Sequence, residues 1–203
     1  SVSCGVHPLH QDEACSYEVL LEKAKRKEVV AIGETGLDYF YSPESKDVQL
    51  TSFVDHIKVA NETNKPLIIH TRDAREDTIN LLREHKAPHT RGVLHCFTES
   101  LEMAQAAIDM DFYISISGIV TFNSAAELRD VVSAIPLERL LIETDSPWLA
   151  PVPHRGKQNQ PGYVVEVAEF IAELKGVSVE ELAKITTRNF YTLFSLASKQ
   201  KVA

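Results

Sequence analysis

The sequence predicts an α/β fold, in which parallel strands and helices alternate as they do in a TIM-type (β/α)8 barrel. Short apolar runs are separated by segments of helix length, which is typical of parallel strands buried on both faces. Four of these runs lead into residue types that bind metal ions, namely 29–33 into Glu34, 66–69 into His70, 92–94 into His95 and 140–144 into Asp145. Parallel strands of a barrel end on one shared face, so these four side chains are expected to meet there.

The individual elements follow from apolar periodicity and from cap signals. Ser42 before Pro43 is typical of a helix start, and Ser178 with Glu181 forms a capping-box pattern. A proline-rich stretch after Asp145 predicts a long irregular loop. Strands are expected at 1–6, 29–34, 66–70, 92–95, 112–117 and 140–145, and helices at 16–27, 43–62, 75–86, 99–110, 125–134, 163–175 and 179–196.

The number of strands bears on the completeness of the barrel. No linker or low-complexity tract interrupts the chain, so a single domain over 1–203 is expected. The pattern gives six strands, and a closed barrel of this type needs eight in about 250 residues. We therefore expect a barrel that lacks its first two βα units. An open doubly wound sheet is the alternative, although ligand residue types at successive strand ends favour the barrel.

Composition limits the class of partner and the compartment. The formal net charge of −8 argues against a broad, non-specific nucleic-acid surface, although bound divalent ions can supply local positive charge. No apolar stretch approaches the roughly 20 residues that span a bilayer, so no membrane association is expected. The three cysteines do not form a disulfide pattern, which favours the cytoplasm. Cys96 should point away from the face that holds His95 and serve in packing.

The chemistry of the four strand-end residues indicates a metal centre. Imidazole and carboxylate groups together suit zinc, manganese or a similar divalent ion. The residues alone therefore favour a metal-dependent hydrolase. For each residue a structural role remains open: Glu34 could cap a loop, and His70 and His95 could be hydrogen-bonded core histidines.

Longer motifs resemble the TatD family of metal-dependent deoxyribonucleases, and its bacterial YcfH-like branch above all. The matching segments are 5–8 (GVHP), 33–39 (GETGLDY), 70–74 (HTRDA), 94–98 (LHCFT), 143–147 (ETDSP) and 154–156 (HRG) with Asn159 and Pro161. They stand in family order and cover essentially the whole chain. The family also opens with a strand carrying a His-x-His pair. The printed sequence has no counterpart, which suggests an N-terminally incomplete domain or a degraded relative.

The resemblance implies a role for each candidate ligand. Glu34 would bridge two divalent ions, either Mg, Mn or Zn. His70 and His95 would bind the second ion, and Asp145 would bind the first and act as general base. Glu143 would support a ligand, bind a further ion, or form a salt bridge in the barrel interior.

Substrate contacts are expected from His7, Arg72 and Arg155, because a phosphodiester needs cations or hydrogen-bond donors. Solvation at the surface is the alternative for both arginines. Three aromatic side chains would either stack on bases or pack the loops, namely Tyr39, Phe40 and Trp148.

The resemblance implies hydrolysis of phosphodiester bonds from DNA ends, with Asp145 and Glu34 as the catalytic residues and no obligatory protein partner. The chain as printed is expected to be weakly active or inactive on its own. Two alternatives remain open. One is an amidohydrolase-like enzyme that acts on another small ester, amide or phosphotriester. The other is a non-catalytic barrel remnant.

Overall fold

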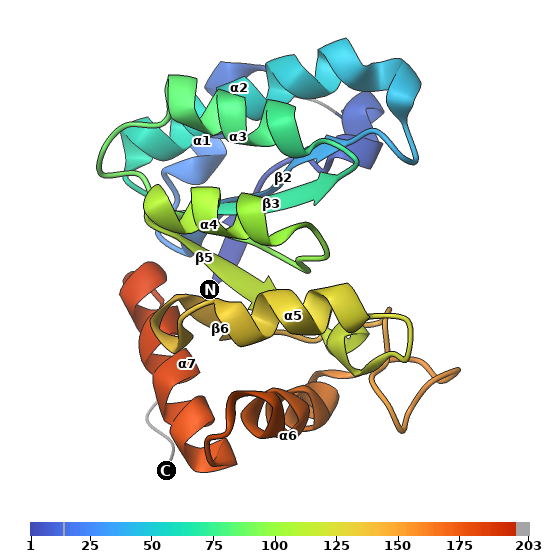
Figure 1. The fold of residues 1–203 in the computed structure, drawn as a ribbon. Coiled ribbons are helices and arrows are strands. Elements are labelled where there is room, and N and C mark those ends of the chain that lie inside the picture. Colours follow the sequence, from blue (N-terminus) through green and yellow to red (C-terminus); the bar gives the residue numbers. More distant parts are fainter. Residues whose placement is uncertain (14, 198–203) are drawn as a thin grey trace. The chain divides into compact units, whose positions relative to one another are not determined.

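The computed structural model describes residues 1–13 and 15–197, which form two compact units (Figure 1). Among the described residues, the first unit contains 1–13, 15–94 and 191–197. The second contains residues 95–190. Each unit has its own parallel strands and covering helices. The prediction that 1–203 form a single domain stays a prediction.

The first unit is built on four parallel strands that neighbour one another in sequence order. Helix α2 packs on β2, and Figure 1 shows α2 and α3 on the same side of β2 and β3. Apolar side chains such as Ile32, Phe53 and Leu67 are fully buried between these layers. The elements are β1 (Val2–Cys4), η1 (Pro8–Glu13), α1 (Tyr17–Ala24), β2 (Val29–Asp38), η2 (Pro43–Ser45), α2 (Lys46–Thr63), β3 (Leu67–Arg72), α3 (Arg75–His85) and β4 (Gly92–Leu94).

The second unit contains the parallel pair of β5 and β6, with α4 packed on β5. Every residue of β5 is buried, as predicted for a parallel strand covered on both faces. The predicted cap of the last helix is present, because the Glu181 N–H donates to Ser178 Oγ at 3.1 Å. The elements are α4 (Leu101–Asp109), β5 (Phe112–Ile116), η3 (Gly118–Thr121), α5 (Ala126–Ala134), η4 (Leu137–Arg139), β6 (Leu140–Ile142), η5 (Pro161–Tyr163), α6 (Val164–Lys175) and α7 (Val179–Leu193), whose last turn belongs to the first unit.

The ends predicted for three strands are wrong in ways that affect the site. β2 continues to Asp38 and β3 to Arg72, so Glu34 and His70 lie inside strands rather than at their ends. Asp145 is the third residue beyond β6, which ends at Ile142. Only His95 follows its strand directly.

The start of α2 also differs from the prediction. Pro43–Ser45 form a separate 3-10 turn, and α2 begins at Lys46. The Ser42 hydroxyl donates to Glu44 at 2.8 Å instead of capping the helix. The buried Gln49 amide donates to the carbonyl oxygens of Asp38 and Ser42, at 3.0 and 2.9 Å. This side chain holds the loop in a shape that local signals do not encode.

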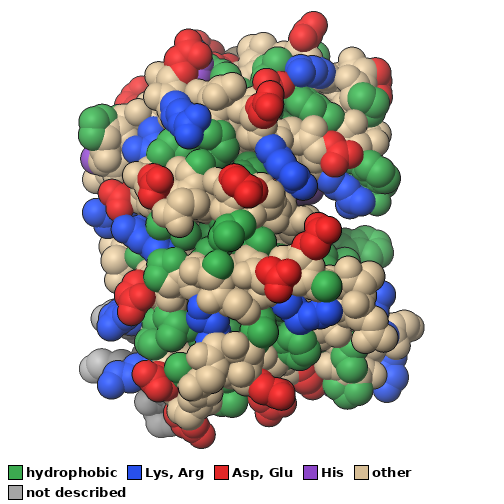
Figure 2. Space-filling model, viewed as in Figure 1, with side chains coloured by type: hydrophobic (Ala, Val, Ile, Leu, Met, Phe, Trp, Pro, Cys, Tyr) green, Lys and Arg blue, Asp and Glu red, His purple; other side chains and the backbone are tan. Residues whose placement is uncertain are grey.

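Charged side chains of both signs are interspersed over the face shown in Figure 2, with no continuous basic surface there. This distribution agrees with the negative net charge of the chain. Of the helices in the described part of the chain, none has the length and apolar character to cross a bilayer. A cytoplasmic location stays a prediction.

A buried histidine on α2 fixes the backbone just before His7. The Val6 N–H donates to His56 Nε2 at 2.9 Å, and His56 Nδ1 lies 2.7 Å from the Ser52 carbonyl oxygen. The ring is therefore neutral, with its proton on Nδ1. Burial lowers the pKa of His56 below 6.5.

The lowered pKa predicts a pH-dependent loss of stability. As pH falls through 6.5, the unfolded chain takes up a proton at His56 before the folded protein does. The stabilisation by neutral His56 is thus complete above this pH and declines below it. We expect His56→Gln to flatten the dependence of unfolding free energy on pH between about 7 and 5, measured by urea unfolding. His89→Gln, at an exposed position, should keep the wild-type slope. An unchanged slope in His56→Gln would contradict this assignment.

Candidate metal centre

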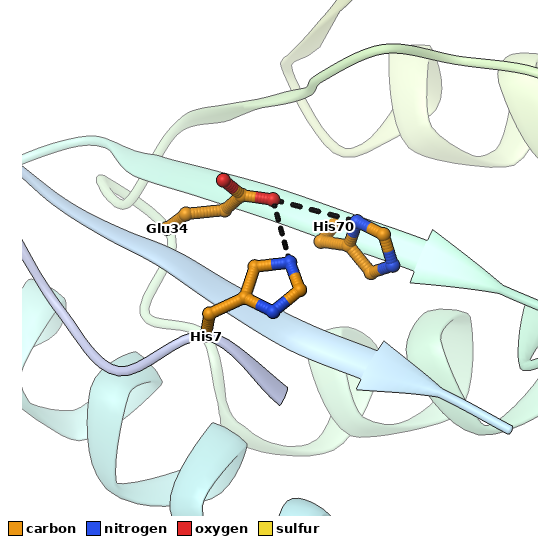
Figure 3. A group of neighbouring side chains, drawn as sticks. All are labelled: His7, Glu34 and His70. Carbon is orange, nitrogen blue, oxygen red and sulfur yellow. Dashed lines mark ion pairs between the residues drawn. The ribbon is translucent and has the colours of Figure 1, made fainter. Parts of the chain in front are cut away.

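The first unit brings His7, Glu34 and His70 together, and both rings point at the carboxylate (Figure 3). His7 Nε2 lies 3.1 Å from Glu34 Oε1, and His70 Nδ1 lies 3.4 Å from the same oxygen. One ligand atom from each residue falls within 4.8 Å of the others. The side chains are between one fifth and one third exposed, so a small ligand can reach them.

Close approach of two strands brings Glu34 beside His70. Gly36 on β2 is paired in register with His70 on β3. A Cβ atom at Gly36 would lie 2.0 Å from the His70 carbonyl oxygen, and the φ of Gly36 is +132°. A side chain at this position would push the strands apart, so glycine permits the geometry.

Asp38 fixes the orientation of the His70 ring. Its side chain is fully buried, and Oδ1 accepts hydrogen bonds from the N–H groups of Phe40 and Tyr41 at 3.1 and 2.8 Å. Its Oδ2 lies 2.9 Å from His70 Nε2. A carboxylate can only accept, so the hydrogen-bond network assigns a proton to His70 Nε2. In the neutral ring, Nδ1 then directs its lone pair toward Glu34.

The spacing of Glu34 and His70 fits a divalent ion. A lone pair facing a carboxylate oxygen at 3.4 Å is repulsive, and a cation between the two atoms removes the repulsion. Two ligands at roughly 2.0–2.2 Å from a tetrahedral ion lie about 3.4 Å from each other. A second proton on His70 would serve the same purpose without metal.

His7 differs from His70, although both rings approach the same oxygen of Glu34. The Leu9 N–H donates to His7 Nδ1 at 3.1 Å, which puts the proton of the neutral ring on Nε2. That N–H then donates to Glu34 Oε1. The hydrogen bonds thus favour Glu34 and His70 as ligands and His7 as a donor, and the substrate-side role of His7 stays a prediction.

In the second unit, the carboxylate of Glu143 lies beside the ring of His95, as Asp38 lies beside His70 in the first unit. Its Nδ1 lies 3.1 Å from Glu143 Oε1, which also accepts the N–H of Cys96 at 2.9 Å. The Ser115 hydroxyl donates to the other oxygen of Glu143. By the same reasoning, His95 Nδ1 carries the proton and Nε2 has the lone pair. Of the roles left open for Glu143, support of a ligand agrees best with these contacts.

The prediction for Cys96 is wrong. It assumed strand alternation, but β4 ends at Leu94, and Cys96 has a φ of +44°. Its Sγ lies 3.2 Å from Ser117 Oγ and 3.9 Å from Asp145 Oδ2. The thiol therefore lies beside a candidate ligand.

The predicted substrate-side residues have different surroundings. Arg72 is exposed, and its guanidinium carbon lies 4.3 Å from the centre of the Phe40 ring. Arg155 packs over Phe122 at 3.7 Å and donates to the Ala150 carbonyl oxygen at 3.3 Å, although it too is exposed.

The three aromatic candidates also differ in their contacts and exposure. The Tyr39 hydroxyl donates to Asp77 at 2.7 Å, which favours the loop-packing alternative for this ring. Trp148 is 70% exposed, and Phe40 is 54% exposed.

Asp38 and Ser115 are site residues that the sequence did not predict. For Asp38 a signal existed, since residues 34, 36 and 38 share one face of an extended strand. It was missed because the strand was expected to end at Glu34. For Ser115 the sequence offered only the alternation of its strand.

Asp38→Asn tests the support of His70. Asparagine accepts the two backbone N–H groups through its oxygen but presents an NH₂ group to His70 Nε2. The ring then favours the tautomer with its proton on Nδ1, which cannot bind metal at that atom. We expect a loss of 10- to 100-fold in metal affinity, measured by competition with a chelator. Asp77→Asn, which changes a carboxylate that bonds Tyr39 and Lys46, is the matched control. Equal affinities of Asp38→Asn and wild type would contradict the role of Asp38.

Comparisons of the sequence with a family model and with individual proteins point to the same family. A family model described as TatD related DNase matches residues 1–195. The chain is 59% identical over 194 residues to the uncharacterized metal-dependent hydrolase YcfH of Escherichia coli K12, covering 96% of the chain and 73% of that protein. It is 38% identical over 202 residues to the 3'-5' ssDNA/RNA exonuclease TatD of Escherichia fergusonii, covering 96% and 78%.

A solved structure extends the likeness to the fold. The crystal structure of YJJV, a TatD homolog from Escherichia coli K12, superposes with a TM-score of 0.87 at 31% identity, covering 95% of the chain and 76% of that structure. Together with the alternating parallel strands and helices, this likeness confirms the predicted α/β class and TIM-type barrel architecture.

Proposed function

Because the chain belongs to the family of TatD-related DNases, we propose that it is a divalent-metal-dependent deoxyribonuclease acting on DNA ends. The observation that carries the proposal is the Glu34–His70 pair, with His70 oriented by buried Asp38. Two relatives support it by name, one as a metal-dependent hydrolase and one as a single-strand exonuclease. The chain spans about three quarters of their length.

In this proposal the ligands are Glu34, His70, His95 and Asp145. Two divalent ions, either Mg, Mn or Zn, would supply an activated water and neutralise charge on the phosphate. Asp38 and Glu143 hold the two imidazoles in the tautomers that expose a lone pair. Asp145 accepts the proton of the attacking water as general base.

Hydrogen-bond donors and positively charged side chains contact the phosphate in this proposal. His7 presents an N–H at Nε2 beside Glu34, where it can bond a phosphate oxygen of the substrate. Arg72 and Arg155 supply positive charge in a chain that is acidic overall. A guanidinium suits a phosphodiester better than the neutral carbonyl of an amide or lactone, which favours DNA over the amidohydrolase alternative.

The test uses metal-free protein reconstituted with Mg, Mn or Zn and single-stranded DNA labelled at either end. We expect hydrolysis that depends on the added ion and shortens the strand progressively from one end. p-Nitrophenyl acetate and a phosphotriester serve as competing substrates in parallel. Faster turnover of either than of DNA would replace the proposal by the amidohydrolase alternative. Absence of metal-dependent turnover on all three would favour a non-catalytic role.

A further inference from the structure

Three side chains of the first unit form an exposed cluster of two rings and one cation. The Arg72 guanidinium carbon lies 4.3 Å from the centre of the Phe40 ring and 4.7 Å from that of Tyr41. The two rings meet edge to face, with centres 4.8 Å apart. Phe40 is 54% and Tyr41 60% exposed. We refer to these residues as the Phe40–Tyr41–Arg72 cluster.

Arg72, the cation of the cluster, lies on the same strand as the candidate metal ligand His70. Arg72 follows His70 by two residues in an extended strand, so both side chains leave the same face, about 6.6 Å apart along the strand. That separation is comparable with the reach of one nucleotide.

The same buried carboxylate fixes the cluster and the ligand. Asp38 accepts the N–H groups of Phe40 and Tyr41 and also binds His70. Asp38 is paired with Arg72 in the strand register. The backbone that carries the two rings is thus tied by hydrogen bonds to the carboxylate that also contacts His70, and the cluster is not a free loop tip.

The contribution of the Phe40–Tyr41–Arg72 cluster to folding stability does not explain why its side chains are held together at the surface. Large apolar rings left more than half exposed bury little surface. Across residues 1–13 and 15–197, the Arg72 guanidinium makes these ring contacts but no ion pair or side-chain hydrogen bond. Its planar donors and the exposed rings remain available to a planar ligand.

We propose that the Phe40–Tyr41–Arg72 cluster stacks the unpaired base of the nucleotide next to the scissile phosphate. This inference rests on the proposed nuclease function and adds a substrate preference to it. Aromatic rings and guanidinium planes stack on bases of any sequence, but only where the base is not paired in a duplex. The cluster therefore selects single-stranded ends without reading their sequence.

The first test removes the base and leaves the phosphate in place. Metal-loaded wild-type protein is assayed on a single-stranded oligonucleotide and on versions with an abasic site at the terminal or the penultimate nucleotide. One of these sites should lower kcat/KM by about 5- to 150-fold, mainly through KM, because stacking of one base contributes that much. Equal kcat/KM on all three oligonucleotides would overturn the inference.

The second test changes the protein. Phe40→Leu keeps an apolar side chain but loses the ring, Phe40→Tyr keeps the ring, and Arg72→Lys keeps the charge but loses the plane. Phe40→Leu and Arg72→Lys should lower kcat/KM on the intact oligonucleotide, and Phe40→Tyr should stay near wild type. On the abasic substrate, Phe40→Leu should add little further loss, because the partner of the ring is already absent. Fully additive losses would contradict stacking. Circular dichroism and metal content identify any variant that fails to fold, and the wild-type abasic comparison decides independently of all variants.

Hydrolysis of bis(p-nitrophenyl) phosphate, which carries no base, distinguishes a failure of the stacking inference from a failure of the proposed nuclease function. If wild type cleaves it and DNA with metal but ignores abasic sites, only the stacking inference fails. If metal-loaded wild type cleaves neither phosphodiester, the proposed function fails and the inference fails with it.

Discussion

In an otherwise complete, active form of the enzyme, Asp145→Asn is expected to lower kcat on single-stranded DNA by about 10²- to 10⁴-fold. In the proposed mechanism, Asp145 binds metal through its charge and accepts the proton of water, and the substitution removes both properties. It leaves the backbone undisturbed, since Asp145 has a φ of +57°, and asparagine tolerates this left-handed conformation. Arg72→Ala should cost much less kcat, because the proposed role of Arg72 is to hold substrate and not to act on the nucleophile. Both variants are measured at saturating DNA and metal.

The control for Asp145→Asn is Asp130→Asn, which changes an exposed carboxylate on α5. It should retain wild-type kcat. Comparable losses of kcat in Asp145→Asn and Arg72→Ala would show that Asp145 does not have the assigned role.

Glu34→Gln is expected to abolish stable metal binding and to reduce hydrolysis at least as strongly as Asp145→Asn. The amide has one neutral acceptor oxygen in place of two charged ones, so it cannot bridge two cations. His70 Nδ1 then faces a ligand set without the negative charge that neutralises the ion. Metal content after dialysis, measured by elemental analysis, and DNA hydrolysis together check this prediction.

His7→Gln distinguishes a donor from a ligand at the same cluster. Because the hydrogen bonds assign a proton to His7 Nε2, this variant should keep its metal while KM for DNA rises. A loss of metal equal to that in Glu34→Gln would instead make His7 a ligand.

The sequence was sufficient to predict the type of fold. Alternation of apolar runs with helix-length segments identified every strand of the described residues, because burial on both faces leaves that pattern. The length of β2 was not predictable. Its last residue, Asp38, is held by the buried Gln49, whose side-chain oxygen accepts the Asp38 N–H at 2.7 Å. A contact between residues 38 and 49 leaves no periodic signal.

The residues that support the ligands were harder to predict than the ligands. His70 and His95 follow or extend apolar runs, whereas Asp38 and Glu143 gain their role from contacts across 32 and 48 residues. Cys96 was misplaced because one residue beyond the end of β4 is enough to remove strand alternation. Local sequence pattern therefore indicated candidate ligand residues, and the tautomers of the two histidines follow only from tertiary contacts.

The central claim is that Glu34 and His70 hold a divalent ion through Oε1 and Nδ1. Anomalous diffraction from crystals of zinc-loaded protein, recorded on both sides of the zinc absorption edge, tests it most directly. We predict a peak roughly 2.0–2.2 Å from both atoms, with the Asp38–His70 hydrogen bond intact. A zinc peak bonded to His70 through Nε2, or zinc peaks that avoid Glu34 altogether, would contradict it.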